Sequence, residues 1–431
     1  MYSYTNKKES HINMPMSAVS YCRADLNNIG ACFKPQAGVS LIELMVSLVI
    51  GLVVSLAIYG VLTANEGRKR TTTSINDIDQ AGTYALYQLD KLIRSAGSGF
   101  SAGRTPLQAG AFIRASEYTY GCPLRVASNG VQLIPASTFP TPFNSVAGAN
   151  LVMAPVIIVN DAAGAGGDVL ITMSGSGGLG ESGTRFSSPA TANQLNLINL
   201  AAMSASVNTG GVNKFDKLLL VAPPAGAISP CMLTQIAPGF TPLPGAGVVP
   251  LSGEFYSSTI AGTSVANYLE TSVVLNFGKS PAFNMLGVGT NNTLFSYNLL
   301  SPANQNGSDS TSLPNPTIFV DSVYRMEAVY GINLPGNPDN VTLSWVQPTG
   351  VFSAANLMAG TTAANANLSR IVAVRVALIM TTALPEKANV SAATTTIFQS
   401  IGLSQVVNLN PLNRRYRVME STISLRNAML P

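Results

Sequence analysis

The most constraining feature of this sequence is an apolar run from Val39 to Thr63, in which Glu43 is the only charged residue. Its length of about 25 residues exceeds the roughly 20 that a helix needs to cross the hydrocarbon core of a bilayer. A polar segment ending at Gly38 precedes the run, whereas a secretory signal peptide has a shorter apolar region followed by its cleavage site. This order predicts a leader peptide, residues 1–38, followed by a membrane-spanning helix, residues 39–63.

Glu43 is the residue of this run that most needs an explanation. An ionisable side chain inside a membrane span costs a few kcal/mol of insertion free energy and usually marks function. If the mature chain starts at Val39, the carboxylate can pair with the amino-terminal ammonium of a neighbouring subunit more easily than with its own. Such a pair would fix the axial register between subunits. The alternative is a carboxylate tolerated near the membrane interface and shielded by lipid headgroups.

The segment Gly38–Leu44, GVSLIEL, resembles the prepilin peptidase motif of type IV pilins and type II secretion pseudopilins. In these families a membrane peptidase cuts after the glycine and methylates the new amino terminus. The resemblance implies cleavage after Gly38, methylation of Val39 and a role for Glu43 in subunit assembly. One departure from the pattern is the valine itself, because phenylalanine is commonest at the first mature position.

The charges beside the run leave its orientation open. Basic residues of the leader favour an inside amino terminus, but Arg68, Lys69 and Arg70 crowd the other end, against the positive-inside tendency. We place the leader in the cytoplasm because of the motif. We therefore expect an inner-membrane protein with a periplasmic head before assembly, and a pilus or cell-surface location afterwards. The leader is long for such proteins, which makes Met14 and Met16 alternative starts.

The helix is expected to continue beyond the membrane. Apolar residues between Ile75 and Ile93 recur at three- and four-residue spacing, which predicts helix to about Ser95. Gly97 and Gly99 then give a stop signal. Further glycines interrupt the helix at Gly51, Gly60, Gly67 and Gly82. Because glycine costs about 1 kcal/mol relative to alanine inside a helix, they are candidate bends, or else positions that permit close packing.

Residues 96–431 change to a pattern of strands and turns. Only 10% of the chain is charged, which suits short strands whose surface is polar through hydroxyl and amide groups. The strand-like runs are Leu151–Asn160, Asp168–Met173, Lys217–Val221, Ser272–Phe277, Thr317–Tyr330, Val341–Val346, Arg370–Met380 and Tyr416–Arg426. The expected fold class is α+β: a long amino-terminal helix and a large β-rich head, built as one sheet core with long insertions or as two lobes.

The cysteines predict a disulfide. Removal of the leader takes away Cys22 and Cys32 and leaves Cys122 and Cys231 as a single pair. A head outside the cytoplasm lies where disulfides persist, and closing a loop of about 110 residues contributes roughly 4–5 kcal/mol in the chain-entropy model. The alternative is two free buried thiols, because sequence alone does not bring the two Cα atoms together.

Histidine usage argues against several enzyme classes. The only histidine, His11, belongs to the leader, so the mature chain would lack a His-based triad, a His metal ligand and an imidazole base. The glycine-rich segment Gly175–Gly180 lacks the following helix and the acidic residue of a dinucleotide site. We therefore expect no enzymatic activity, metal, cofactor or small-molecule substrate.

A small basic cluster surrounds Tyr416 near the end of the chain. Alternation within a strand would put Arg415 and Arg417 on one face, with Arg414 and Tyr416 on the other. A sheet face or a subunit contact is favoured over DNA binding, which needs a broader basic stripe. Nucleic acid is the less favoured partner.

The segment Asn76–Gly97 and the closing segments Arg370–Ile379 and Arg414–Asn427 resemble the PilW family of minor pilins. The resemblance implies a minor pilin whose partners are the prepilin peptidase, other minor and major pilins, and the inner membrane. It further implies membership of an initiating or tip complex that supports twitching motility, adhesion or DNA uptake. Two alternatives stay open: a J-type pseudopilin of type II secretion, and a pilus-tip adhesin or DNA receptor, which the unmatched middle, residues 101–315, suggests.

Overall fold

The computed structural model describes residues 40–100, 104–106, 112–136, 138–148, 151–164, 166–176, 183–200, 218–224, 229–241, 247–301, 316–334 and 343–428. The chain divides into two compact units, Met1–Gly67 and Arg68–Pro431. Strands make up 36% and helices 27% of the structure, so the α+β class with a β-rich head is confirmed. The domain boundaries expected from the sequence stay predictions.

Helix α1, Leu41–Ser95, confirms the long helix expected from the apolar periodicity. In its second half the buried residues recur every three or four positions and form one stripe. These residues are Ile78, Gly82, Ala85, Leu89 and Ile93. The helix ends at the expected stop signal, where Gly97 and Gly99 both adopt a φ of +81°, a conformation that favours glycine.

A residue from the other end of the chain caps the carboxy-terminal end of α1. The side-chain amide of Asn427 donates hydrogen bonds to the backbone oxygens of Ser95 (3.2 Å) and Ala96 (3.1 Å). It thereby satisfies carbonyls near the helix end, where backbone oxygens lack intrahelical partners. The backbone nitrogen of Gly97 in turn donates to the oxygen of Met173 in strand β6, Val169–Ser174, at 2.8 Å.

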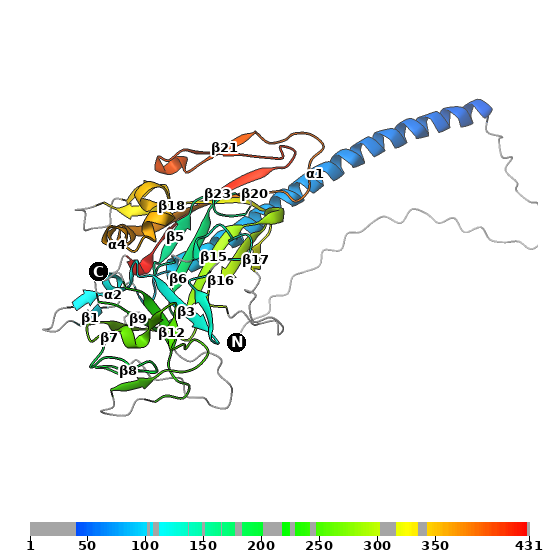
Figure 1. Cartoon of the computed structure of the whole chain (residues 1–431). Coiled ribbons are helices and arrows are strands. Elements are labelled where there is room, and N and C mark those ends of the chain that lie inside the picture. Colours follow the sequence, from blue (N-terminus) through cyan, green and yellow to red (C-terminus); the bar gives the residue numbers. More distant parts are fainter. Residues whose placement is uncertain are drawn as a thin grey trace, which may run out of the picture. The chain divides into compact units, whose positions relative to one another are not determined.

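The sheet against which α1 packs is antiparallel, with the strand order β19-β18-β20-β23. Its strands are β18 (Val323–Asn333), β19 (Leu343–Val346), β20 (Ile371–Thr381) and β23 (Tyr416–Ser424). Met380 and Met419 lie on its helix-facing side, next to Gly82. Strands β21 (Thr394–Ile397), labelled in Figure 1, and β22 (Gln405–Asn408) form a hairpin. This hairpin supplies Phe398 and Val407 to a separate apolar cluster with Ile379.

Two larger sheets build the rest of the head. One has the order β17-β16-β15-β6-β5, and the other has the order β4-β3-β10-β9-β14-β7, with β3 and β10 paired in parallel. Their other strands are β3 (Leu124–Ser128), β4 (Val131–Ile134), β5 (Val156–Val159), β7 (Thr184–Arg185), β9 (Leu218–Ala222), β10 (Cys231–Gln235), β14 (Val273–Gly278), β15 (Ala282–Val288), β16 (Leu294–Asn298) and β17 (Thr317–Val320). The main hydrophobic core joins Leu89 of α1, Leu170, Leu220 and Tyr330, so the helix and all three sheets contribute to it.

A second apolar cluster covers the outer face of the six-stranded sheet. In β9 the side chains alternate, because Leu220 belongs to the main core and Val221 to this cluster. Leu195 and Val249 close it from the strand pair β8 (Gln194–Asn196) and β11 (Val248–Pro250). The remaining strands and α-helices of the described residues are β1 (Arg104–Pro106), β2 (Phe112–Arg114), α2 (Ala115–Thr119), β12 (Thr259–Ile260), β13 (Thr263–Ser264), α3 (Ala354–Leu357) and α4 (Thr362–Ser369).

Every strand-like run named from the sequence overlaps an observed strand. One of them, Thr317–Tyr330, is broken into β17 and β18, because Ser322 turns the chain with a φ of +65°. Several observed strands were not expected, among them β3, β10, β15 and β16. The last two contain polar residues such as Asn284 and Ser296, which hide them from a search for apolar runs.

Candidate functional site

Two of the residues implicated in processing, Gly38 and Val39, lie outside the described residues. The described chain begins at Ser40, whose carbonyl oxygen accepts hydrogen bonds from the backbone nitrogens of Glu43 (2.9 Å) and Leu44 (3.1 Å). Glu43 therefore lies in the first turn of α1, where a negative charge interacts favourably with the helix dipole. Its side chain is exposed, and within the described part of the chain the carboxylate makes no ion pair or hydrogen bond.

The first half of α1 is apolar on all sides. Its large apolar side chains, from Leu41 to Leu62, are between 50% and 77% exposed. By length and composition this helix can cross a membrane. A helix that is hydrophobic all round needs lipid or protein around it, so this half is consistent with membrane anchoring.

Gly82 lies where α1 packs on the four-stranded sheet. An added Cβ would collide with the Met419 sulfur and lie 3.1 Å from Cγ of Met380. Close packing is therefore the role of this glycine. Around Gly51 and Gly67, by contrast, no atom lies within 4 Å of such a Cβ.

In the basic cluster Arg417 and Tyr416 lie on opposite faces of β23, as predicted, whereas Arg414 and Arg415 precede the strand. Nε of Arg417 contacts Oδ1 of Asp79 in α1 at 2.7 Å. Tyr416 points to the opposite face, where its ring lies 5.1 Å from that of Tyr324. Arg414 donates to the backbone oxygen of Thr382 at 3.1 Å. These contacts give the cluster a structural role in joining β23 to the rest of the head.

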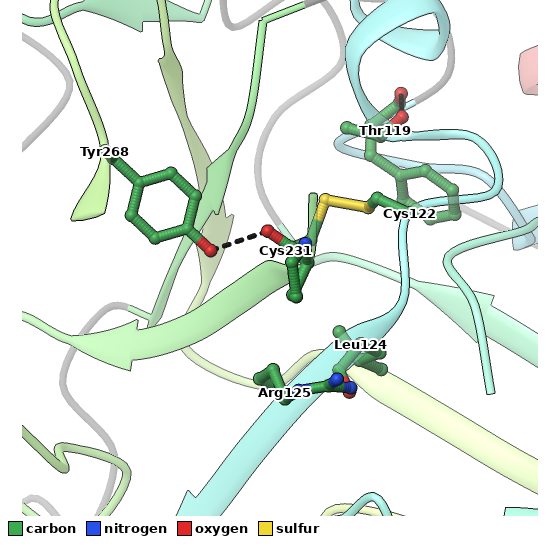
Figure 2. The surroundings of a disulfide bond; sticks show 8 residues. Thr119, Cys122, Leu124, Arg125, Cys231 and Tyr268 are labelled. Carbon is green, nitrogen blue, oxygen red and sulfur yellow. Dashed lines mark hydrogen bonds between the residues drawn. A yellow bond between two sulfur atoms is a disulfide. The ribbon is translucent and has the colours of Figure 1, made fainter. Parts of the chain in front are cut away.

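The disulfide between Cys122 and Cys231 is confirmed, with the two Cα atoms 5.6 Å apart (Figure 2). It joins the segment leading into β3 to the start of β10, and the backbone nitrogen of Cys231 also donates to the oxygen of Pro123 at 2.8 Å. Tyr268 helps to hold the segment that leads into Cys231, because its hydroxyl donates a hydrogen bond to the backbone oxygen of Pro230 at 2.6 Å (Figure 2). Both cysteines are buried.

A group of charged side chains at the junction of β6 and β18 was missed from the sequence. Asp168 is 1% exposed, and its carboxylate accepts hydrogen bonds from the backbone nitrogens of Asp161 (3.1 Å) and Ala328 (2.8 Å). Arg325 hydrogen-bonds Glu327 and contacts Asp161 at 2.6 Å. The available signal was the pair Arg325 and Glu327, which interrupts an otherwise apolar strand.

Within this cluster, burial has its strongest effect on the protonation of Asp168. Burial, and to a smaller extent the negative charge of Glu327, raise the pKa of Asp168 to about 8. Glu327 is itself 1% exposed, and Arg325 and the side-chain amide of Gln405 (3.0 Å) are its partners. Because the group fastens the five-stranded sheet to the edge of β18, its role is to hold the head together.

Two sequence families match this chain. Residues 33–59 match the prokaryotic N-terminal methylation motif. Residues 288–427 match the type IV pilus-assembly protein W family, PilW. Together these matches support a PilW-type pilin. Neither the search of curated proteins nor that of solved structures found a match.

The two matches cover separate parts of the chain. The PilW match runs from the end of β15 through β23 and includes the closing segments Arg370–Ile379 and Arg414–Asn427, as expected. The expected likeness of Asn76–Gly97 lies outside the matched residues and stays a prediction. Both matches indicate a pilin-like minor component of a type IV pilus, a structural part of the assembly.

Proposed function

We propose that this PilW-type pilin is made as a membrane-bound precursor, cleaved after Gly38 and methylated on Val39 by the prepilin peptidase. The mature subunit then leaves the bilayer and joins other minor and major pilins in the initiating or tip complex of the pilus. That complex supports twitching motility, adhesion or DNA uptake. The methylation-motif match at residues 33–59 supports the processing step.

The observation that carries this proposal is Glu43, a single carboxylate in a helix half that is otherwise apolar and exposed on all sides. Moving such a helix from lipid into a bundle of like helices keeps it away from water in both states. Helix packing and polar contacts must therefore drive the exchange. An ion pair between Glu43 and the methylated amino terminus of a neighbour supplies the polar contact and sets the register.

Two observations support the proposed location and machine. The disulfide is the kind that persists in an oxidising compartment, in agreement with a periplasmic head. The PilW match favours a pilus over type II secretion, whose J-type pseudopilins share the amino-terminal features.

The first experiment is the intact mass and amino-terminal sequence of the protein recovered from membranes, with and without the peptidase. We expect a chain that begins at methylated Val39 when the peptidase is present, and the full leader when it is absent. A chain left uncut in the presence of the peptidase, or cut at another residue, contradicts the proposal.

A second candidate function, a pilus-tip adhesin or DNA receptor, is favoured by the extent of the family match. Residues 60–287, which contain the six-stranded sheet and the disulfide, match neither family. Binding of the full-length protein in nanodiscs to immobilised duplex DNA or to host surface material, above that of empty nanodiscs, tests it. Absence of both interactions leaves the assembly role alone.

A further inference from the structure

Three basic residues at the end of the apolar run have no role in the assembly proposal. Arg68, Lys69 and Arg70 are exposed, and within the described part of the chain they make no salt bridge. They lie on the side of the run where the positive-inside tendency disfavours cations. Chain connectivity keeps Arg68 near the membrane, because five helical residues after Thr63 advance only about 8 Å.

A loop of the head approaches this basic segment. Oε1 of Glu386 accepts a hydrogen bond from the Thr71 hydroxyl at 3.2 Å and one from Nε of Arg415 at 3.1 Å. The pKa of Glu386 is lowered, first by the hydrogen bond from Arg415 and in smaller part by the charge of Arg70. The loop of residues 383–391 therefore lies beside the first turns of α1 that belong to the head.

The backbone of this loop is held in place. The nitrogen of Glu386 donates to the oxygen of Asn413 at 2.6 Å, and that of Val390 donates to the oxygen of Leu412 at 3.0 Å. These hydrogen bonds hold the loop backbone in one conformation, so the side chains of the loop lie at defined positions. Among them, Lys387 is exposed and makes no salt bridge within the described residues, and Leu384 is 51% exposed.

These side chains together form a surface that we call the basic foot: Arg68, Lys69, Arg70, Leu384, Lys387 and Val390. It contains four cations and two exposed apolar side chains, and Val390 is 39% exposed. The nearby Glu386 forms its ion pair with Arg415 and carries one negative charge against four cations, so the surface keeps a net positive charge. Cations beside apolar side chains suit the boundary between phospholipid headgroups and acyl chains, where the charge contacts phosphate and the apolar part enters the lipid.

We propose that the basic foot binds anionic phospholipid headgroups of the leaflet from which α1 emerges, while the subunit waits in the membrane before assembly. The inference rests on the membrane anchoring of the proposed function. Anionic headgroups offer Arg68, Lys69 and Arg70 a favourable partner on the head side of the membrane. Release from these lipids then becomes part of each subunit's departure into the filament.

The test uses the full chain reconstituted in vesicles. An environment-sensitive dye is attached to the thiol that Leu384→Cys introduces at position 384. Cys22→Ser and Cys32→Ser remove the other free thiols, and an intact Cys122–Cys231 bond checks folding. In phosphatidylcholine vesicles containing phosphatidylglycerol we expect a blue-shifted emission relative to phosphatidylcholine alone. High salt should reverse the shift, because it screens exposed charges.

Charge-reversal variants test whether the emission shift depends on the lysines of the basic foot. Lys387→Glu should reduce it by at least half, and Lys69→Glu/Lys387→Glu should abolish it. Lys91→Glu, which makes the same charge change at an exposed lysine further along α1, should leave it unchanged. A second probe at Val390→Cys repeats the measurement if the dye at position 384 disturbs the loop.

The outcomes separate the two proposals. Carbonate-resistant flotation with the vesicles measures anchoring, and a chain that fails to float overturns both the anchoring and the lipid contact. A chain that floats but emits identically in the two vesicle types overturns the lipid contact alone, as does an equal effect of Lys387→Glu and Lys91→Glu. A shift produced by duplex DNA in neutral vesicles, with none produced by phosphatidylglycerol, would assign the foot to nucleic acid instead.

Discussion

The two halves of α1 belong to one continuous helix but meet opposite requirements. From Leu41 to Leu62 the apolar side chains point in every direction and are at least half exposed. Beyond Arg68 a single stripe is buried, and the rest of the helix surface is polar or charged apart from exposed aromatic residues such as Tyr84 and Tyr87. The first half thus requires an apolar environment that the chain itself does not supply, whereas the second half finds it in the head.

Glycine shows the difference at the level of single atoms. At Gly82 the missing side chain is needed, because Met419 and Met380 occupy the space where a Cβ would lie. At Gly67 that space is open. The same residue type is therefore fixed by packing inside the subunit in one half, and is left available for contacts with other molecules in the other.

The largest effect on filament assembly is expected from removing the one charge of the apolar half. Glu43→Ala should leave cleavage and methylation intact but lower incorporation into filaments at least about tenfold, which corresponds to about 1.4 kcal/mol or more. Immunoblots of sheared filaments and of membranes measure this ratio. Glu66→Ala, at an exposed glutamate beyond the apolar run, is the control. Normal piliation by Glu43→Ala would sink the register argument.

The head half can be loosened without changing the apolar half. Replacing the disulfide by Cys122→Ser/Cys231→Ser should lower the free energy of unfolding of the head by about 2–4 kcal/mol. Denaturant titration in detergent, followed by near-UV circular dichroism, measures it. Cys22→Ser/Cys32→Ser in the leader should change nothing, and an equal loss in both double variants would refute the prediction.

A large side chain placed at Gly82 should lower the stability of the protein, whereas one placed at Gly67 should raise it. Gly82→Leu forces Met419 and Met380 to move and should cost about 1–3 kcal/mol of stability. Gly67→Leu meets no atom within 4 Å and should gain up to about 1 kcal/mol from helix propensity. The same denaturant titration compares them. Equal effects would erase the distinction between the two halves.

The head should also respond to pH through Asp168. Its pKa is raised to about 8 in the folded state and is about 3.9 when unfolded, so the folded state alone holds this proton between those values. Stability should therefore fall as the pH rises from about 4 to about 8, by up to about 1.4 kcal/mol per pH unit. Asp168→Asn should flatten the slope, measured as unfolding free energy at pH 5 and pH 8. Asp77→Asn, an exposed control, should retain it.

The smallest effect is expected at the ion pair between helix and sheet. The side chains of Arg417 and Asp79 are 53% and 34% exposed, and such pairs contribute less than about 1 kcal/mol. Arg417→Ala should therefore lower the unfolding free energy by no more than that. A loss above about 2 kcal/mol would mean that the ion pair, rather than the buried stripe, fastens α1 to the head.

Local sequence patterns were sufficient to predict the helix and the strands whose apolar side chains recur at regular spacing. The helix to Ser95, the long strand β20 and the closing strand β23 were all expected, because periodicity and stop signals are properties of neighbouring residues. The disulfide was also expected, since removal of the leader leaves a single pair of cysteines. The processing residues Gly38 and Val39 stay predictions.

What the sequence did not reveal depends on contacts between distant segments. Asp168 and Glu327 read separately as ordinary acids, and they influence each other only because β6 meets the edge of β18. Gly82 had two equal interpretations until Met419, far along the chain, was seen beside it. The basic foot likewise needs the loop of residues 383–391 to lie next to Thr71. No local pattern contains these distances.

The cap that Asn427 places on α1 joins two segments that are synthesised at different times. The amide and the carbonyl of Ser95 that it contacts are 332 residues apart. At the usual synthesis rate of about 5–20 residues per second, the helix end is made roughly 17–66 s before its cap. Throughout that interval the helix end and its place beside the closing strand stay incomplete. The cap therefore forms only in a chain that has been translated through residue 427.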